Sequence, residues 1–229
     1  ILLNARITKK SFNRWSIIKT FSHSIFGLID KAYSQNFETN YFLKRLKVKN
    51  ITSTGNLKFI EHDGFKTNQA DKKLFSQFKK YKTFVAASTH NTEELFAAKT
   101  HIILKKKLKN IITIIIPRHI NRVDQIISQM NALGLNVISR RSNKKKLDNI
   151  DVYLVDTFGE SKKFYKFATT VFLGGSIIKR GGQNPLEPAR FGAKILHGPN
   201  IDNFRDVYKY LNQLKISSKI NTPNQCANS

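Results

Sequence analysis

The chain alternates between short apolar strands and amphipathic helices from residue 83 onward, and this alternation constrains its fold most strongly. Residues 111–116 read Ile-Ile-Thr-Ile-Ile-Ile, an unbroken β-branched run that is typical of a strand buried on both faces. Pro117 ends the run, and helical periodicity follows over residues 122–133 with Gly134 as a C-cap. Repeated strand–helix–strand units predict right-handed crossovers and a parallel sheet. We therefore expect ligands at the carboxyl ends of these strands.

The other predicted elements of this region continue the alternation. Strands are expected over residues 83–88, 135–139, 152–155, 170–173 and 194–197, and helices over residues 92–104, 162–168, 185–191 and 203–214.

The pattern before residue 61 is different. Three helices are predicted there, and a short β-like segment follows them at residues 51–59. The first helix is capped by Ser11 and carries Phe12, Trp15, Ile18 and Phe21, and the others cover residues 24–33 and 39–46. A polar stretch from Glu61 to Asp71 separates the two patterns. We therefore expect an N-terminal lobe remnant at residues 1–62, a linker at 63–75 and a C-terminal lobe at 76–229.

The two ends of the sequence also carry information. The chain begins at Ile1 with what reads as the end of a buried strand, and residues 224–229 show no cap or stop signal. No signal peptide is visible, and no apolar run approaches the roughly 18–20 residues of a membrane span. We expect a piece of a longer protein, truncated in its N-terminal lobe and at the end of its C-terminal lobe.

The net charge of +25, from 40 Lys and Arg against 15 Asp and Glu, favours an anionic partner such as nucleic acid, nucleotide or anionic lipid. Hydrophobic residues make up 40% of the 229, which is enough for a packed core. Lysine, isoleucine and asparagine share A/T-rich codons, so codon composition is the alternative explanation for much of the charge, and the positions of the few arginines are more informative. Cys226 is the single cysteine, which excludes an internal disulfide and a Cys/His zinc site.

Polar residues follow the predicted strands at the edge where ligands bind. Arg118 follows the buried strand at residues 111–116, and its guanidinium can hold a phosphate through two hydrogen bonds. His119 can donate to the same oxygen. Surface positions remain the alternative for both side chains. Another polar segment, Asp156-Thr157-Phe158-Gly159-Glu160, follows the strand at residues 152–155.

Two glycine pairs, Gly174-Gly175 and Gly181-Gly182, allow the backbone to approach an anion closely. The helix that starts at Pro185 then directs its first amides toward this loop. Glu187 lies in its first turn, where the helix dipole favours a carboxylate, and it is placed to bind two vicinal hydroxyls such as those of ribose. An ordinary helix-start Glu is the alternative.

Two further residues are weaker candidates. Lys58 precedes Phe59 in the first lobe and can meet a charged group in a cleft, although a solvated lysine is the more common outcome. His90 precedes Glu93 and Glu94, but no second histidine follows at helical spacing, so we expect no metal site.

Seven motifs occur together in the order and spacing of one family. They are Asn4-Ala5-Arg6 with Ser11-Phe12, Gly55-Asn56-Leu57-Lys58-Phe59, Ala87-Ser88-Thr89-His90, Pro117-Arg118-His119, Asp156-Thr157-Phe158-Gly159-Glu160, Gly174-Gly175-Ser176 and the block from Gly181 to Ala189. The chain resembles the bacterial 3-deoxy-D-manno-octulosonic acid (Kdo) transferases of lipopolysaccharide synthesis over almost all of residues 1–210.

The resemblance implies an α/β fold of the glycosyltransferase B type, with two Rossmann-like lobes around a cleft. It implies CMP-Kdo as donor, a lipid A precursor as acceptor at the cytoplasmic face of the inner membrane, and neither a metal nor another cofactor. Lys58 would stabilise the charge that develops during transfer, and Glu187 would bind the ribose. Matched motifs place the remaining CMP contacts at Pro117, Arg118, Phe158, Gly159, Glu160, Asn184, Pro185 and Leu186. Phe158 stands where the family often has Met.

The resemblance also implies an N-terminal membrane anchor and a Glu general base, and neither has a match in this chain. We therefore expect an enzyme fragment that does not transfer sugar by itself. Two other classes remain open: a glycosyltransferase B enzyme that uses a UDP-sugar, and a non-enzymatic basic module that binds RNA. The second requires aromatic residues interleaved with Lys and Arg on an exposed face. Here the aromatic residues fall within apolar periodic segments, which favours a core and argues against a nucleic-acid partner.

Overall fold

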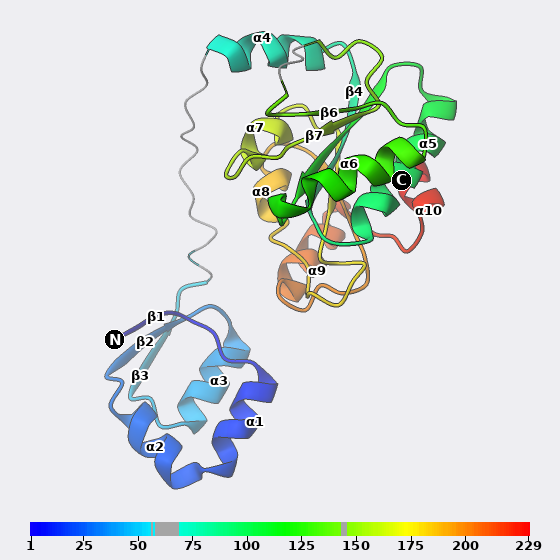
Figure 1. Ribbon diagram of the computed structural model, residues 1–229. Coiled ribbons are helices and arrows are strands. Elements are labelled where there is room, and N and C mark those ends of the chain that lie inside the picture. The colour runs from blue at the N-terminus through cyan, green and yellow to red at the C-terminus, as the bar shows by residue number, and fades with distance from the viewer. Residues whose placement is uncertain (56, 58–68, 143–145) are drawn as a thin grey trace. The chain divides into compact units, whose positions relative to one another are not determined.

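The computed structural model describes residues 1–55, 57, 69–142 and 146–229. The chain divides into two compact units, Ile1–Gly64 and Phe65–Ser229 (Figure 1). Within the described ranges, we find no helix with the length and apolar character that crossing a membrane requires.

The first unit is a small parallel sheet with helices packed on it. Its strands lie in the order β1-β2-β3 and its core contains Ala32, Leu43 and Leu46. The rings of Phe12 and Phe42 stack at 4.5 Å and join α1 to α3. The elements are β1 (Leu2–Ala5), α1 (Lys9–Ile17), α2 (Lys19–Gly27), β2 (Lys31–Ser34), α3 (Phe37–Arg45) and β3 (Asn50–Ser53).

The predictions for the first two helices of this unit are wrong. The first helix does not extend to Phe21, because α1 ends at Ile17 and Phe21 lies in α2. Thr8, and not Ser11, caps α1, because the Thr8 side chain accepts a hydrogen bond from the backbone nitrogen of Ser11. The helix expected over residues 24–33 is also incorrect, since α2 ends at Gly27 and β2 begins at Lys31. Pairing of β2 with both β1 and β3 determines the strand, and a local periodicity carries no information about such long-range pairs.

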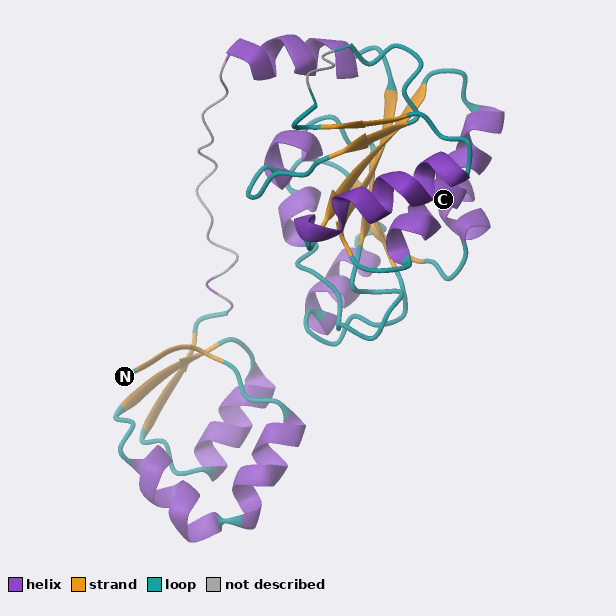
Figure 2. Cartoon of the chain, viewed as in Figure 1, coloured by secondary structure: helices purple, strands orange, loops and turns teal. Residues whose placement is uncertain are grey.

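The second unit contains seven parallel strands in the order β10-β9-β8-β4-β5-β7-β6, as expected for a doubly wound fold (Figures 1 and 2). The strands are β4 (Lys82–Thr89), β5 (Ile111–Pro117), β6 (Val137–Ser139), β7 (Val152–Leu154), β8 (Thr170–Leu173), β9 (Lys194–His197) and β10 (Ser217–Lys219). The structure confirms the six strands predicted for this region within two residues at each end, whereas β10 was not predicted.

Helices cover both faces of this sheet, which explains its continuous apolar strands. Alternate residues of β4 face different cores: Phe84 and Ala86 pack with α5, α6 and α10, while Val85 and Ala87 pack with α4, α7 and α9. The helical elements are α4 (Gln69–Phe78), α5 (Glu93–Lys107), the 3-10 turn η2 (Ile120–Arg122), α6 (Val123–Ala132), α7 (Ser161–Tyr165), α8 (Leu186–Ala189), α9 (Arg205–Gln213) and α10 (Pro223–Asn228).

Helix α4 overlaps the linker expected at residues 63–75. Leu74 and Phe78 of this helix are buried in the core of the second unit, and Asp71 is 1% exposed. The second unit therefore includes residues that the polar composition of residues 61–71 assigned to a connection.

Candidate functional site

The carboxyl ends of the strands form the candidate site of the second unit. β4, the first strand of this unit, lies at its centre between β5 on one side and β8 on the other. The chain moves away from β4 in one direction through β5 and later returns to its other side with β8. Such a reversal in strand order leaves a crevice between neighbouring loops, where open α/β sheets bind their ligands.

Glu93 joins two of the loops at this edge. It is the first residue of α5 and is fully buried. Its Oε2 accepts hydrogen bonds from the backbone nitrogens of His90 (3.0 Å) and Gly175 (2.7 Å), and its Oε1 accepts from Ser176 (3.1 Å) and Ile177 (3.0 Å). Four amide donors and the helix dipole stabilise a carboxylate at this position. Glu93 therefore fixes the loop after β8 against the loop after β4.

Two glycines allow these loops to pack closely. A Cβ on Gly174 would lie 2.4 Å from the carbonyl oxygen of Ser88, and a Cβ on Gly198 would lie 2.3 Å from that of Ser176. Both distances are too short for any side chain, so only glycine fits. These contacts hold the loops after β4, β8 and β9 together at one edge.

Histidine and arginine side chains gather at this edge. The rings of His90 and His119 stack with their centroids 5.6 Å apart. Burial lowers the pKa of His90, and the positive charges of His119, Arg180 and Arg118 lower it further, against the opposing effect of Glu93. Nδ1 of His90 is buried without a hydrogen-bond partner. The positive field and the unpaired ring nitrogen both suit an anionic ligand.

Pro117 and Arg118 lie at the carboxyl end of β5, beside this group. Pro117 is the last residue of the strand, and the backbone nitrogen of Arg118 donates to the carbonyl oxygen of Thr89 at 2.8 Å. The side chain of Arg118 is exposed, so its guanidinium is free to meet a ligand from solvent.

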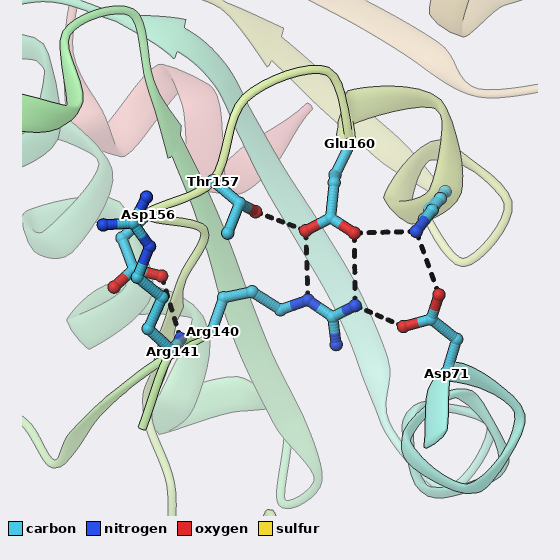
Figure 3. A network of polar contacts seen from close by, with 7 residues as sticks. Asp71, Arg140, Arg141, Asp156, Thr157 and Glu160 are labelled. Atoms are coloured by element: carbon cyan, nitrogen blue, oxygen red, sulfur yellow. Dashed lines mark hydrogen bonds and ion pairs between the residues drawn. The ribbon is translucent and has the colours of Figure 1, made fainter. Parts of the chain in front are cut away.

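The loop after β7 ends at Glu160, whose side chain lies against Arg140 and Thr157 (Figure 3). Phe158 is 75% exposed, and Gly159 has φ +73°, which favours glycine. The side chain of Glu160 turns inward to Arg140, Lys163 and Thr157. Burial opposes ionisation of Glu160, but hydrogen bonds from these three residues outweigh it and lower its pKa to about 2. At neutral pH this carboxylate is occupied by protein partners, so the loop offers a ligand its backbone and Phe158.

The segment from Asn184 to Glu187 lies at the start of α8. The side chain of Asn184 accepts from the backbone nitrogen of Leu186 at 3.2 Å, and Pro185 is the N-cap. Glu187 Oε1 lies 3.9 Å from Nζ of Lys162 in α7, with the Glu187 side chain 30% exposed. Because α7 begins directly after Glu160, this contact brings two of the sequence-predicted segments together.

The described structure thus places all but one of the predicted site residues on loops at the carboxyl edge of one sheet. Lys58 lies outside the described residues. In the described ranges, no group of three or more His, Cys, Asp or Glu side chains is arranged to hold a metal ion.

Three important residues were missed by the sequence analysis. Glu93 appeared there only in connection with a metal, although its position at a helix start is a detectable signal for a carboxylate. Arg140 and Asp71 gave no local signal, because their partners lie far along the chain: Arg140 and Asp71 are 69 residues apart.

Comparison with known proteins supports the motif assignment. Residues 1–61 match the family described as 3-deoxy-D-manno-octulosonic-acid transferase (kdotransferase). The chain is 31% identical over 229 residues to a 3-deoxy-D-manno-octulosonic acid transferase of Rickettsia bellii, covering 100% of this chain and 54% of the relative. It is 27% identical to the Haemophilus influenzae enzyme of the same name, covering 97% of this chain and 53% of that protein. The chain spans about half the length of these curated relatives.

A solved structure has a similar fold. The C-terminal CMP-Kdo binding domain of WaaA from Acinetobacter baumannii superposes with a TM-score of 0.61 at 23% identity, covering 69% of this chain and 86% of that one. The fold class is therefore that of the glycosyltransferase B enzymes. Along its whole length the sequence is similar to the Kdo transferases, and the predicted resemblance to this family is confirmed.

Proposed function

We propose that the chain is part of a glycosyltransferase that moves Kdo from CMP-Kdo to a lipid A precursor in lipopolysaccharide core synthesis. One observation carries this proposal. In a chain similar to Kdo transferases, Arg118, His119, Arg180 and His90 gather around closely packed glycine loops at the carboxyl edge of the sheet. A positively charged edge of this kind suits the phosphate of a nucleotide sugar.

The donor nucleotide makes three kinds of contact in this proposal. Arg118, which follows Pro117, holds the phosphate, and the Phe158-Gly159-Glu160 loop supplies backbone groups. Asn184 to Glu187 form the third contact, in which the Glu187 carboxylate accepts hydrogen bonds from the two ribose hydroxyls. The side chain of Glu187 is 30% exposed, and Nζ of Lys162 lies 3.9 Å from its Oε1.

The transfer breaks the bond between Kdo and the CMP phosphate, and CMP leaves with the bonding electrons. The acceptor hydroxyl forms the new glycosidic bond and gives its proton to a general base. CMP is a good leaving group with a single phosphate, so we propose that positive side chains stabilise it without a metal or another cofactor. Lys58 is proposed to stabilise the developing charge from the other lobe.

We also propose the cytoplasmic face of the inner membrane as the place of action, because the lipid A precursor is a membrane lipid. Each Lys or Arg near an anionic lipid surface contributes about 1 kcal/mol of attraction. With a net charge of +25, the chain is suited to this surface, and we propose no role in nucleic-acid binding.

Calorimetric titration of the 229-residue chain with CMP and with UDP tests the proposal. We expect CMP to bind more tightly than UDP, and Glu187→Ala to weaken CMP binding by about 1–3 kcal/mol, the range for buried polar groups that lose a partner. Asp206→Ala, which removes an exposed carboxylate from the first turn of α9, is the matched control and should leave CMP binding unchanged.

Two results would contradict the proposal. Preference for UDP would identify a different sugar donor. Equal CMP affinity in the Glu187→Ala and unsubstituted chains would remove Glu187 from the ribose site.

A further inference from the structure

Four charged side chains from three segments of the chain meet beside the loop after β7 (Figure 3). Asp71 comes from α4, Arg140 follows β6, Glu160 ends the loop and Lys163 lies in α7. Arg140 binds Glu160 through two hydrogen bonds, Nε to Oε2 at 3.1 Å and Nη2 to Oε1 at 3.2 Å. Its Nη2 also donates to Asp71. Lys163 bridges the two acids, at 2.9 Å from Asp71 and 2.7 Å from Glu160.

The four side chains are mostly buried and comprise two acids and two bases. The side chains of Arg140, Glu160 and Lys163 are 17%, 15% and 17% exposed, and that of Asp71 is 1% exposed. Burial opposes ionisation of Asp71, but hydrogen bonds from Lys163 and Arg140 outweigh it and lower its pKa. Two carboxylates therefore face two cations at neutral pH. Burying ion pairs gives little net stability on average, so a buried network of this kind is better explained by what it positions.

The network positions the loop from Asp156 to Glu160. At its start, Asp156 Oδ1 accepts from the backbone nitrogen of Arg141 at 3.0 Å. At its end, Glu160 is bound by Arg140 and by the hydroxyl of Thr157. Both ends are thus tied to the segment at residues 140–141, while Phe158 between them is 75% exposed.

We propose that Arg140 is a positioning residue for the donor nucleotide, which it serves by fixing this loop, and that Asp71 and Lys163 hold Arg140 and Glu160 in place. The inference rests on the proposed function, in which the backbone of residues 158–160 contacts CMP. A loop held before binding loses less conformational entropy when the ligand arrives, which raises affinity. Arg140 itself contacts Glu160 and Asp71 and acts on the ligand through the loop.

The geometry also explains why arginine occupies this position. Two parallel hydrogen bonds to one carboxylate, together with a third to Asp71, require the planar fork of a guanidinium. A lysine at position 140 would keep the charge but would lose at least one of these bonds. Arg140→Lys should therefore lie between the unsubstituted chain and Arg140→Ala in every measurement.

The first measurement is CMP affinity, by calorimetry on the 229-residue chain. We expect Arg140→Ala to weaken CMP binding at least tenfold and Lys163→Ala to weaken it by a smaller factor. Lys105→Ala is the matched control, because Lys105 also pairs with a buried carboxylate, Asp151 at 2.5 Å, at the opposite end of β7. CMP affinity should stay within twofold in this control.

The second measurement reports the motion of the loop. Trp15 is the single tryptophan, so a chain carrying Trp15→Phe and Phe158→Trp has one indole, placed in the loop. We expect Arg140→Ala to lower the fluorescence anisotropy of this indole at temperatures well below the melting transition, while Lys105→Ala leaves it unchanged. A purely structural role for Arg140 would lower the melting temperature without changing this local motion.

The outcomes separate the two proposals. If the unsubstituted chain binds no CMP, the proposed function fails and this inference fails with it. If the chain binds CMP but the Arg140 variants match it in affinity and anisotropy, the positioning role is overturned and the proposed function stands. Should Arg140→Ala not fold, Arg140→Lys decides by the same two criteria.

Discussion

The two ends of strand β7 carry similar charges that are used differently. Before the strand, Asp151 is bound by His101 (3.2 Å), Lys105 (2.5 Å) and the backbone nitrogen of Asn136 (3.0 Å). After the strand, Glu160 is bound by Arg140 and Lys163. At both ends a carboxylate with low exposure is paired with basic side chains. The first group joins helix α5 to the sheet, and the second holds the loop after β7.

The amino-end group connects helix α5 to the sheet, because His101 and Lys105 of this helix both bind Asp151. His101 is fully buried and also contacts the hydroxyl of Thr113 in β5 at 2.8 Å. At the carboxyl end, the corresponding bonds hold loops whose backbone and glycines remain at the surface. Charge at the amino end therefore joins a helix to the sheet, whereas charge at the carboxyl end holds a loop of the candidate site.

Removing the Glu93 carboxylate at the carboxyl end should cause the largest loss of stability and of CMP binding. Glu93→Ala leaves four buried or half-buried amide donors without their acceptor, and at roughly 1 kcal/mol for each donor we expect a loss of about 3–4 kcal/mol in the free energy of unfolding. CMP binding should be lost with it. Urea unfolding followed by circular dichroism measures the first quantity, and calorimetry measures the second.

Glu94→Gln is the control for the Glu93→Ala variant, since Glu94 is equally buried and adjacent in sequence. Burial raises the pKa of Glu94 despite its bond with Arg122, so a neutral amide is tolerated better there. A similar loss of stability in both variants would show that Glu93 has no special function at the carboxyl end.

Adding a side chain at Gly174, where the loop after β8 touches the end of β4, should cause the next largest loss of stability. A Cβ in Gly174→Ala would meet the backbone of Ser88 and Thr89 at 2.4 and 2.6 Å, and such overpacking destabilises by about 1–3 kcal/mol. CMP affinity should fall as the loops separate. Gly27→Ala, whose Cβ has 4.0 Å to its nearest neighbour, is the control and should not reduce stability. Unchanged CMP affinity in Gly174→Ala would show that the close packing of these loops is not needed for the site.

Lowering the pH should weaken the amino end of β7 while Glu160 at the other end stays ionised, and this is the smallest effect of the three. Burial lowers the pKa of His101, against the effect of Asp151, so the unfolded chain takes up this proton first as the pH falls below about 6.5. Stability should therefore decrease toward pH 5, by at most about 1.4 kcal/mol per pH unit for this one proton. Glu160, with a pKa of about 2, stays ionised throughout this range.

Urea unfolding of the unsubstituted chain and of His101→Gln between pH 5 and 7.5 checks this expectation. Other histidines with lowered pKa values, His90 and His197, contribute to both curves, so the difference in slope isolates His101. Equal slopes would show that His101 does not titrate differently in the folded state.

The sequence predicted the second unit well because its information is local. The Ile-rich run at residues 111–116 and the glycine and proline that end each element define strands and helices without reference to partners. The same rules mark the carboxyl edge, so the loops at residues 117–119, 156–160 and 174–187 could be selected as a site. The first unit was predicted less well, because β2 depends on pairing with two other strands.

The features that the sequence could not predict are those that depend on distant partners. Lys163 and Asp71 are 92 residues apart, yet they meet in one buried network. Gly174 looks like an ordinary turn glycine until the backbone of Ser88 is placed beside it. The residue types of a ligand site can be recognised from local motifs, whereas the contacts that hold the site in shape require the folded chain.

The order of strands in the second unit also has a consequence for its synthesis. Strand β4 is the central strand and is made first, but β8 pairs with one of its edges through partners such as Phe84 and Thr170. A ribosome adds roughly 5–20 residues per second, so that edge has no strand from its own sheet for about 4–17 seconds. During this time the apolar β4–β5 pair is exposed to edge-to-edge association with other nascent chains.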